Sequence, residues 1–135
     1  MSAKASNIND TDTKKKISCL IVEDNLVNQK ILLRFLSNLG VSADLANDGL
    51  EAVDVVKQKA YDIIFMDIQM PRMDGISATK CILNECQLEK LPIVIAVTAN
   101  TSSDIRKTCK EIGMKEFIPK PVSMKVLRNL LDRWG

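Results

Sequence analysis

The stretch that most constrains the fold runs from Tyr61 to Gly75 and reads YDIIFMDIQMPRMDG. An apolar segment ends at a carboxylate, Asp67, and gives way to a turn that contains Pro71. A short run rich in isoleucine and phenylalanine and closed by turn residues is typical of a buried central strand. Asp67 would then lie at the carboxyl end of that strand, where open α/β sheets bind their ligands.

A carboxylate in that position has two interpretations. It can act as a nucleophile toward a phosphoryl group. Alternatively, it caps the turn that follows and has no chemical role. The stretch alone does not decide between the two, so the other strand ends are needed.

The rest of the chain repeats one pattern, a short apolar run followed by a segment with apolar residues at helical spacing. The runs that predict strands are residues 17–22, 41–46, 61–66, 92–97 and 116–119. Asn25 and either Ser102 or Ser103 stand where a helix N-cap belongs. Gly40 and Gly113 stand where helices end.

Strands that alternate with helices predict an α/β domain with a parallel sheet and right-handed crossovers. The run at 41–46 is polar enough for an edge strand, whereas the run at 92–97 is nearly all apolar and suits a strand covered on both faces. We therefore predict a five-stranded parallel sheet in the order 2-1-3-4-5, with helices on both faces. This is the flavodoxin-like (βα)5 arrangement.

Residues 1–16 are small, polar and without periodicity, which predicts a disordered leader or linker before a folded domain at 17–135. Four lysines and two aspartates in this segment account for the formal net charge of +2. A neutral domain has no electrostatic footprint for nucleic acid, so we expect no direct nucleic-acid binding. No apolar stretch approaches the roughly 20 residues that span a bilayer. We expect no membrane contact by this domain, and a location in the cytoplasm or in the cytoplasmic part of a membrane-anchored protein.

The chain has no histidine, which excludes Ser-His-Asp and Cys-His catalysis. Its cysteines, without Cys-x-x-Cys spacing, are Cys19, Cys81, Cys86 and Cys109. A zinc site would need all of them from distant elements, so we expect buried thiols in a reducing compartment. Any phosphohistidine donor must be another molecule or another domain.

The predicted strand ends share one edge of the sheet. Glu23 and Asp24 follow the first strand and Asp67 the third. Thr98 follows the fourth strand and Lys120 the fifth. Three uncompensated carboxylates would repel one another strongly, so we expect Lys120 and a divalent cation among them. Mg²⁺ suits a site made of oxygen ligands.

This set of groups permits phosphoryl transfer, with Asp67 attacking phosphorus while Lys120 and Mg²⁺ neutralise the phosphoryl oxygens. Thr98 can donate a hydrogen bond to one of those oxygens. Each group also has a structural interpretation. The acidic pair can cap the first helix, Thr98 can bond to the backbone, and Lys120 can be solvated. Their coincidence on one edge favours the chemical interpretation.

These residues stand in motifs that resemble the response-regulator receiver domain, the phospho-accepting module of two-component signalling. The matching motifs are IVEDN at 21–25, NDGLEA at 47–52, MDIQMPRMDG at 66–75, VTA at 97–99 and PKP at 119–121. The resemblance covers residues 16–134. It implies that Asp67 is the phosphoacceptor and that Thr98 and Lys120 contact the phosphoryl group. It further implies that Mg²⁺ is bound by Glu23, Asp24, Asp67 and the backbone carbonyl of Gln69.

The resemblance also implies a switch in which the Thr98 hydroxyl moves toward the phosphoryl group while the ring of Phe117 turns inward. The alternative for Phe117 is an ordinary core phenylalanine. The Lys120-Pro121 peptide bond is expected to be cis.

The acidic pair followed by Asn28-Gln29 is similar to the receiver domains of hybrid sensor histidine kinases. This implies a histidine kinase or a histidine-containing phosphotransfer protein as partner, docked on the helix that carries Val27, Ile31 and Leu32. A receiver catalyses its own phosphorylation and dephosphorylation, and a hybrid parent chain would be a histidine kinase. The expected state is a monomer or a weak, phosphorylation-dependent dimer.

The predicted function is thus to take a phosphoryl group from phosphohistidine onto Asp67, with Mg²⁺, and to switch conformation or relay the group. One alternative is a pseudo-receiver that acts as a scaffold without phosphate, but the acidic pair, the acceptor and the lysine are all retained. The other is a phosphatase of the haloacid-dehalogenase type. That family needs an acid two residues after the nucleophile, where this chain has Gln69.

Overall fold

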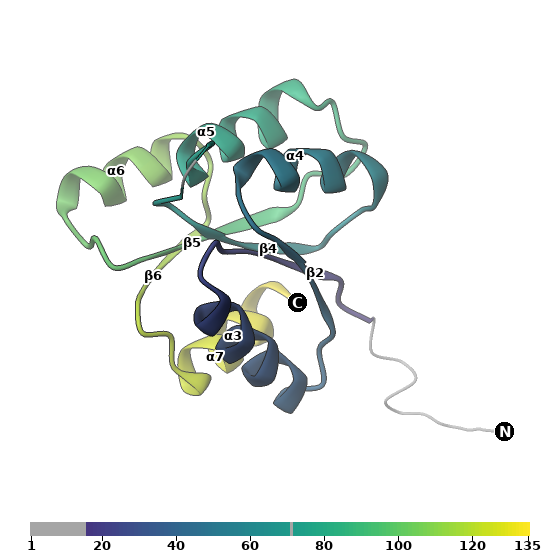
Figure 1. Ribbon diagram of the computed structural model, residues 1–135, viewed down its shortest axis with the longest axis vertical. Helices are drawn as coiled ribbons and strands as arrows, with labels where there is room; N and C mark the ends of the chain where they lie inside the picture. Colours follow the sequence, from purple (N-terminus) through teal and green to yellow (C-terminus); the bar gives the residue numbers. More distant parts are fainter. Residues whose placement is uncertain (1–15, 71) are drawn as a thin grey trace, which may run out of the picture.

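A computed structural model of the protein describes residues 16–70 and 72–135, so all but the last residue of the predicted leader lies outside the described residues. Elements carry the labels of Figure 1. The strands are β2 (Cys19–Val22), β3 (Ala43–Ala46), β4 (Ile63–Asp67), β5 (Ile93–Thr98) and β6 (Glu116–Pro119). The helices are α3 (Leu26–Asn38), α4 (Gly49–Gln58), α5 (Gly75–Lys80), the π-helical turn η1 (Cys81–Glu85), α6 (Ser103–Glu111) and α7 (Met124–Trp134). Among the described helices, none combines the length and apolar character that crossing a membrane requires.

The strands form one parallel sheet in the order β3-β2-β4-β5-β6, which is the predicted order 2-1-3-4-5. The polar strand β3 lies at an edge, and its residues Asp44 and Leu45 are exposed. The central strands β2, β4 and β5 are almost completely buried. The fold class predicted from the alternation of strands and helices is therefore confirmed.

The helices cover both faces of the sheet, α3 and α7 on one side and α4, α5 and α6 on the other (Figure 1). Side chains along each strand alternate between the two faces because the strand period is two residues. Ile21 and Phe65 pack in the apolar cluster under α3 and α7. Val22 and Met66, one position further, pack in the cluster under α4, α5 and α6. The domain thus has two apolar layers, one on each side of the sheet.

The predicted helix boundaries follow from their caps. The side chain of Asn25 accepts a hydrogen bond from the Asn28 N–H at 3.0 Å, and α3 begins at the next residue. Ser102, rather than Ser103, caps α6. Gly40 and Gly113 lie just past their helices with φ of 81° and 106°, a backbone region that favours glycine.

Two details differ from the sequence pattern. The alternation of strands and helices predicts one helix between the third and fourth strands, but α5 ends at Lys80 and a π-helical turn follows. The apolar positions of α3 divide into two rows. Leu32 is buried against the sheet, whereas Val27 and Ile31 are 64% and 42% exposed. Helical spacing identifies apolar residues, but the packing angle of the helix decides which row meets the core.

Candidate functional site

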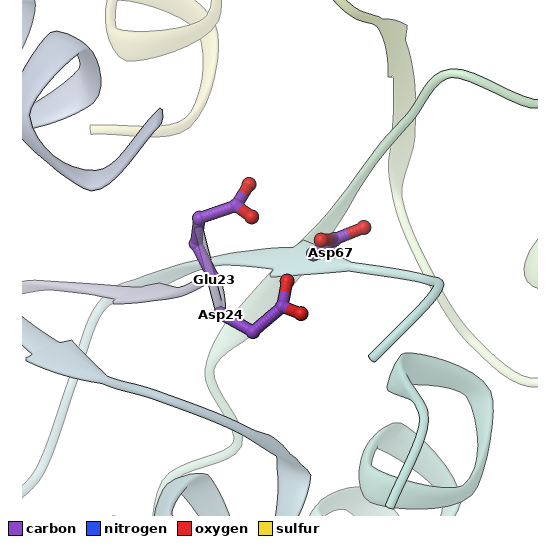
Figure 2. Close-up of side chains that lie close together, drawn as sticks. All are labelled: Glu23, Asp24 and Asp67. Atoms are coloured by element: carbon purple, nitrogen blue, oxygen red, sulfur yellow. The ribbon is translucent and has the colours of Figure 1, made fainter. Parts of the chain in front are cut away.

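Three carboxylates gather at the carboxyl edge of the sheet. Glu23 and Asp24 directly follow β2, and Asp67 is the last residue of the neighbouring strand β4. Val22 pairs with Met66, so Glu23 and Asp67 come level with each other. One oxygen from each of the three groups lies within 4.8 Å of the others (Figure 2). Glu23 and Asp67 are buried, whereas Asp24 faces solvent.

Lys120 supplies the positive charge at this edge. Its ammonium lies 2.9 Å from Glu23 Oε1 and 3.2 Å from Asp67 Oδ2. The Lys120 backbone N–H donates to the Thr98 carbonyl at 3.0 Å, and the peptide bond to Pro121 is cis, as expected. Burial alone would lower the pKa of Lys120, but the hydrogen bond to Glu23 and the charge of Asp67 raise it above its ordinary value. Lys120 is therefore a cation shared by two acids.

One ammonium does not compensate both buried acids. Burial raises the pKa of Glu23, yet the Lys120 hydrogen bond and the Asn25 N–H bring it below its ordinary value. Burial and the charge of Glu23 raise the pKa of Asp67 to about 6, although Lys120 and the Gln69 N–H oppose the shift. The shortage of positive charge is thus concentrated at Asp67.

This donor set fits Mg²⁺. All three side chains offer hard oxygen ligands, and Asp24 is open to the water molecules that Mg²⁺ retains when it binds. A second cation beside Asp67 would also supply the positive charge that Lys120 alone does not. The Gln69 N–H donates to Asp67 Oδ1 at 3.1 Å and orients the carboxylate. A metal bond from the Gln69 carbonyl stays a prediction.

Thr98 is the last residue of β5, beside β4, and it is fully buried. Its Oγ1 accepts a hydrogen bond from the Asn100 N–H at 3.0 Å, so the structural role considered for Thr98 is present. That bond leaves the hydroxyl proton available for another acceptor. Phe117 lies in β6, half-buried in the cluster under α6, and the Arg106 guanidinium is 4.7 Å from its ring centroid. Among the described contacts of Phe117, none therefore joins its ring to the three carboxylates or to Lys120.

Sequence reasoning noted Gln29 within a motif but missed its role in the site, where it is a buried amide on α3. Its Nε2 donates to the Glu23 backbone carbonyl at 2.6 Å and to Asn47 Oδ1 at 2.8 Å. Gln29 thereby ties the turn that carries the acidic pair to the loop after β3. The signal was present, because Gln29 lies three residues before Leu32 and seven before Leu36, on the row that faces the core. A polar residue in that row needs a buried partner.

The loop after Asp67 is also held from outside the acidic cluster. Arg72 has a φ of 65°, and its Nε lies 2.6 Å from Asp48 Oδ2 at the start of α4. Gly75 packs so closely that a Cβ there would lie 2.1 Å from the Asp67 carbonyl oxygen. A side chain at position 75 would displace the backbone that carries Asp67. Both features depend on contacts across the loop, which the motif alone does not reveal.

The sequence pattern of the response regulator receiver domain matches residues 19–132. The chain is 43% identical over 125 residues to histidine protein kinase 1 of Candida albicans, covering 86% of this chain and 5% of that protein. It is 35% identical over 144 residues to the response regulator mcs4 of Schizosaccharomyces pombe, covering 88% of this chain and 28% of that protein. The chain thus spans a small part of these relatives.

Solved structures that share the fold include two receiver domains at 35% sequence identity. The receiver domain of Ssk1 from Saccharomyces cerevisiae, crystallised with the histidine phosphotransfer protein Ypd1, superposes with a TM-score of 0.81 at 35% identity, covering 89% of each chain. The receiver domain of the sensor histidine kinase PA1611 from Pseudomonas aeruginosa has a TM-score of 0.78 at 35% identity, covering 89% of this chain and 98% of that one. That structure has a magnesium ion coordinated in its active-site cleft.

Proposed function

The chain belongs to the response regulator receiver domain family, and on that premise we propose that its residues 17–135 accept a phosphoryl group from phosphohistidine onto Asp67 with Mg²⁺. The observation that carries this proposal is the arrangement of charged side chains at the carboxyl ends of β2 and β4. There a buried Asp67 lies within 4.8 Å of Glu23 and Asp24, and Lys120 bridges Glu23 and Asp67. An acceptor, acids for a cation and a fixed ammonium are the parts that phosphoryl transfer needs.

Each side chain has one task in this proposal. Asp67 attacks phosphorus through the carboxylate oxygen that is not held by the Gln69 N–H, the P–N bond of the phosphohistidine breaks, and the donor imidazole leaves. Lys120 moves its hydrogen bond from Asp67 Oδ2 to an oxygen of the incoming phosphoryl group, and Glu23 keeps the ammonium in place. The Thr98 hydroxyl donates its proton to a second phosphoryl oxygen. Glu23, Asp24 and Asp67 would hold Mg²⁺, which when bound would supply positive charge to offset the phosphoryl oxygens.

The exposed row of α3 is the proposed docking surface for the donor. It consists of Leu26, Val27 and Ile31, which are large apolar residues with much of their surface in solvent. Ile31 also lines a small hollow that reaches Glu23 and Lys120. A partner that covers this row would bring its phosphohistidine next to Asp67. The partner we propose is a histidine-containing phosphotransfer protein, the class of protein that accompanies the Ssk1 receiver domain in its crystal.

The decisive measurement is intact mass after incubation with acetyl phosphate, with Mg²⁺ or with EDTA. We expect one added phosphoryl group that requires Mg²⁺ and is absent from Asp67→Asn. Asp54→Asn is the matched control, because Asp54 is an exposed acid on α4. Loss of the added group in the control, or its persistence in Asp67→Asn, would contradict the assignment of the acceptor.

The donor surface is tested separately, because acetyl phosphate needs no docking. Val27→Asp and Ile31→Glu should reduce labelling by a phosphorylated phosphotransfer protein while labelling by acetyl phosphate is retained. Val126→Asp is the control, since Val126 is an exposed apolar residue of α7. If the wild-type chain accepted no phosphoryl group from either donor, a scaffold role without phosphate would replace this proposal.

A further inference from the structure

A second group of reactive side chains lies away from the acidic centre of Glu23, Asp24 and Asp67, at the two ends of η1. The Sγ atoms of Cys81 and Cys86 are 4.0 Å apart, and both thiols are free and half-buried. Cys19 and Cys109 are also free, but they are buried in the two apolar layers. Within residues 16–70 and 72–135, only the pair Cys81 and Cys86 therefore combines two thiols in contact with access to solvent.

The π-helical turn is what brings the two thiols together. Residues five apart on an α-helix point about 140° away from each other, because each residue turns the helix by about 100°. In η1 the Cys86 N–H instead donates to the Cys81 carbonyl at 3.0 Å, the i to i+5 bond of a π-helix. The wider turn places residues 81 and 86 on nearly the same side.

The surroundings of these thiols carry both charges, and one lysine among them can receive a small anion. Cys86 lines a surface hollow of about 370 Å³, whose charged lining residues are Lys57, Lys59, Lys90 and Glu89. Lys59 and Lys90 also form ion pairs with Asp44 and Asp62, so Lys57 is the cation we assign to an incoming anion. Burial, the hydrogen bond with Cys86 and the charge of Glu85 raise the pKa of the Cys81 thiol, and the charge of Lys57 opposes that shift.

We propose that Cys81 and Cys86 form a dithiol modification site, which a small anionic disulfide such as glutathione disulfide converts into an intramolecular disulfide. Disulfide bonds have an S–S length of about 2.05 Å, so the sulfur atoms must approach by roughly 2 Å. Sulfur atoms already in contact can do this by rotation of the two side chains. The site lies outside the phosphoryl-transfer residues and does not depend on the proposed function.

The reaction proceeds by two thiol–disulfide exchanges. One protein thiolate attacks a sulfur of glutathione disulfide, the glutathione S–S bond breaks, and one glutathione leaves as thiolate. The second protein thiol, deprotonated, attacks the protein-bound sulfur of this mixed disulfide and releases the second glutathione. Two protein thiols are oxidised, one glutathione disulfide is reduced to two glutathione thiols, and the two protons released by the protein thiols are taken up, through the solvent, by the two glutathione thiolates.

The test is incubation of the native full chain with glutathione disulfide, acid quenching and peptide mapping. We expect wild type to lose two hydrogens and to carry one cross-link between Cys81 and Cys86, while Cys19 and Cys109 remain alkylatable thiols. Cys81→Ser and Cys86→Ser should instead retain a mixed disulfide with glutathione, because the resolving thiol is missing. A stable glutathione adduct on the wild type, or no reaction at either cysteine, would overturn the proposal.

Two further measurements test separately the closeness of the two thiols and the preference for an anionic disulfide. Phenylarsine oxide, which needs two adjacent thiols, should bind wild type and neither serine variant under reducing conditions. Equal binding to a serine variant would contradict the pairing. The cationic disulfide cystamine should react several-fold more slowly than glutathione disulfide, and Lys57→Gln should reduce that difference. A cystamine rate equal to or above that of glutathione disulfide would overturn the anionic substrate class.

Discussion

The acidic centre and the ion pairs of the surface use the same chemical groups in opposite ways. Away from the centre, Lys59 meets the exposed Asp44 at 2.8 Å, and the exposed Arg72 meets the buried Asp48 at 2.6 Å, one cation for each acid. At the centre, two buried acids share the single ammonium of Lys120, and an exposed third acid lies beside them. In these pairs each acid has its own cation, whereas the acidic centre has fewer positive than negative charges. This excess of negative charge lowers the stability of the fold at the place where we propose that another cation and a phosphoryl group bind.

The pKa directions record the same difference. Hydrogen bonds from Lys59 and Arg72 lower the pKa values of Asp44 and Asp48. Burial and the charge of Glu23 raise the pKa of Asp67 to about 6. A lowered carboxyl pKa adds stability that is lost on acidification, and a raised one removes stability that is regained on acidification. The two regions should therefore respond to pH with opposite signs.

The largest expected effect is the loss of the shared cation. Lys120→Met should lower the free energy of unfolding by about 3 kcal/mol at pH 7 without metal, because it leaves two buried carboxylates uncompensated. Urea unfolding followed by Trp134 fluorescence measures it. Lys125→Met on the exposed face of α7 is the control, and the double variant Lys120→Met/Asp67→Asn should recover part of the loss. A loss no larger than that of the control would show that the centre is already compensated.

Adding the missing cation should act in the other direction. Mg²⁺ at ten times its dissociation constant should raise the free energy of unfolding by about 1.4 kcal/mol, since it binds the folded state and not the unfolded one. The same urea titration, with Mg²⁺ or EDTA, measures the shift. Asp67→Asn and Asp24→Asn should reduce it, whereas Asp54→Asn should leave it unchanged. An equal shift in all variants would mean that Mg²⁺ acts on other surface acids.

Acidification should reveal the raised pKa of Asp67 in metal-free buffer. Between its unfolded value and about 6, folded Asp67 binds more protons than unfolded Asp67, so stability rises as pH falls. Wild type should gain about 1 kcal/mol from pH 7 to pH 5 relative to Asp67→Asn, whose amide does not titrate. Parallel curves for the two proteins would remove the distinction drawn between the centre and the surface.

The smallest effect is expected at a complete surface pair. Lys59→Ala should cost less than about 0.5 kcal/mol at pH 7, and salt should diminish that cost further, because both partners are about half exposed. The contribution of Asp44 is present above its unfolded pKa and disappears as the pH falls through its lowered folded value. Urea unfolding at low and high salt checks the cost. A loss approaching that of Lys120→Met would contradict the ranking.

Much of the fold follows from local sequence patterns. The alternation of apolar runs and helical segments predicts the sheet and its strand order, and Asn25 and Gly40 mark the ends of α3. These signals are readable because a strand, a cap or a left-handed turn restricts the residues at a few adjacent positions. The strand-end positions of Glu23 and Asp67 follow as well, since parallel strands end at one edge.

Other features have no local signal. The exposure of Val27 and Ile31 depends on how α3 lies against the sheet, and the contact between Cys81 and Cys86 depends on one π-helical turn. Glu23 and Gln29 are only six residues apart, yet the bond from the Gln29 amide to the Glu23 carbonyl requires the whole turn to be in place. Small changes in helix register or angle would alter each of these contacts while leaving the apolar pattern intact.

The sequence by itself determined the class of fold, the strand order and the set of charged residues at one edge, because these follow from periodicity and from the topology of parallel strands. Only the tertiary structure decided how those charges balance. The sharing of one Lys120 ammonium by Glu23 and Asp67, and the resulting rise in the pKa of Asp67, come from distances between segments up to 97 residues apart. Electrostatic interaction depends on those distances and on burial, neither of which a linear pattern contains.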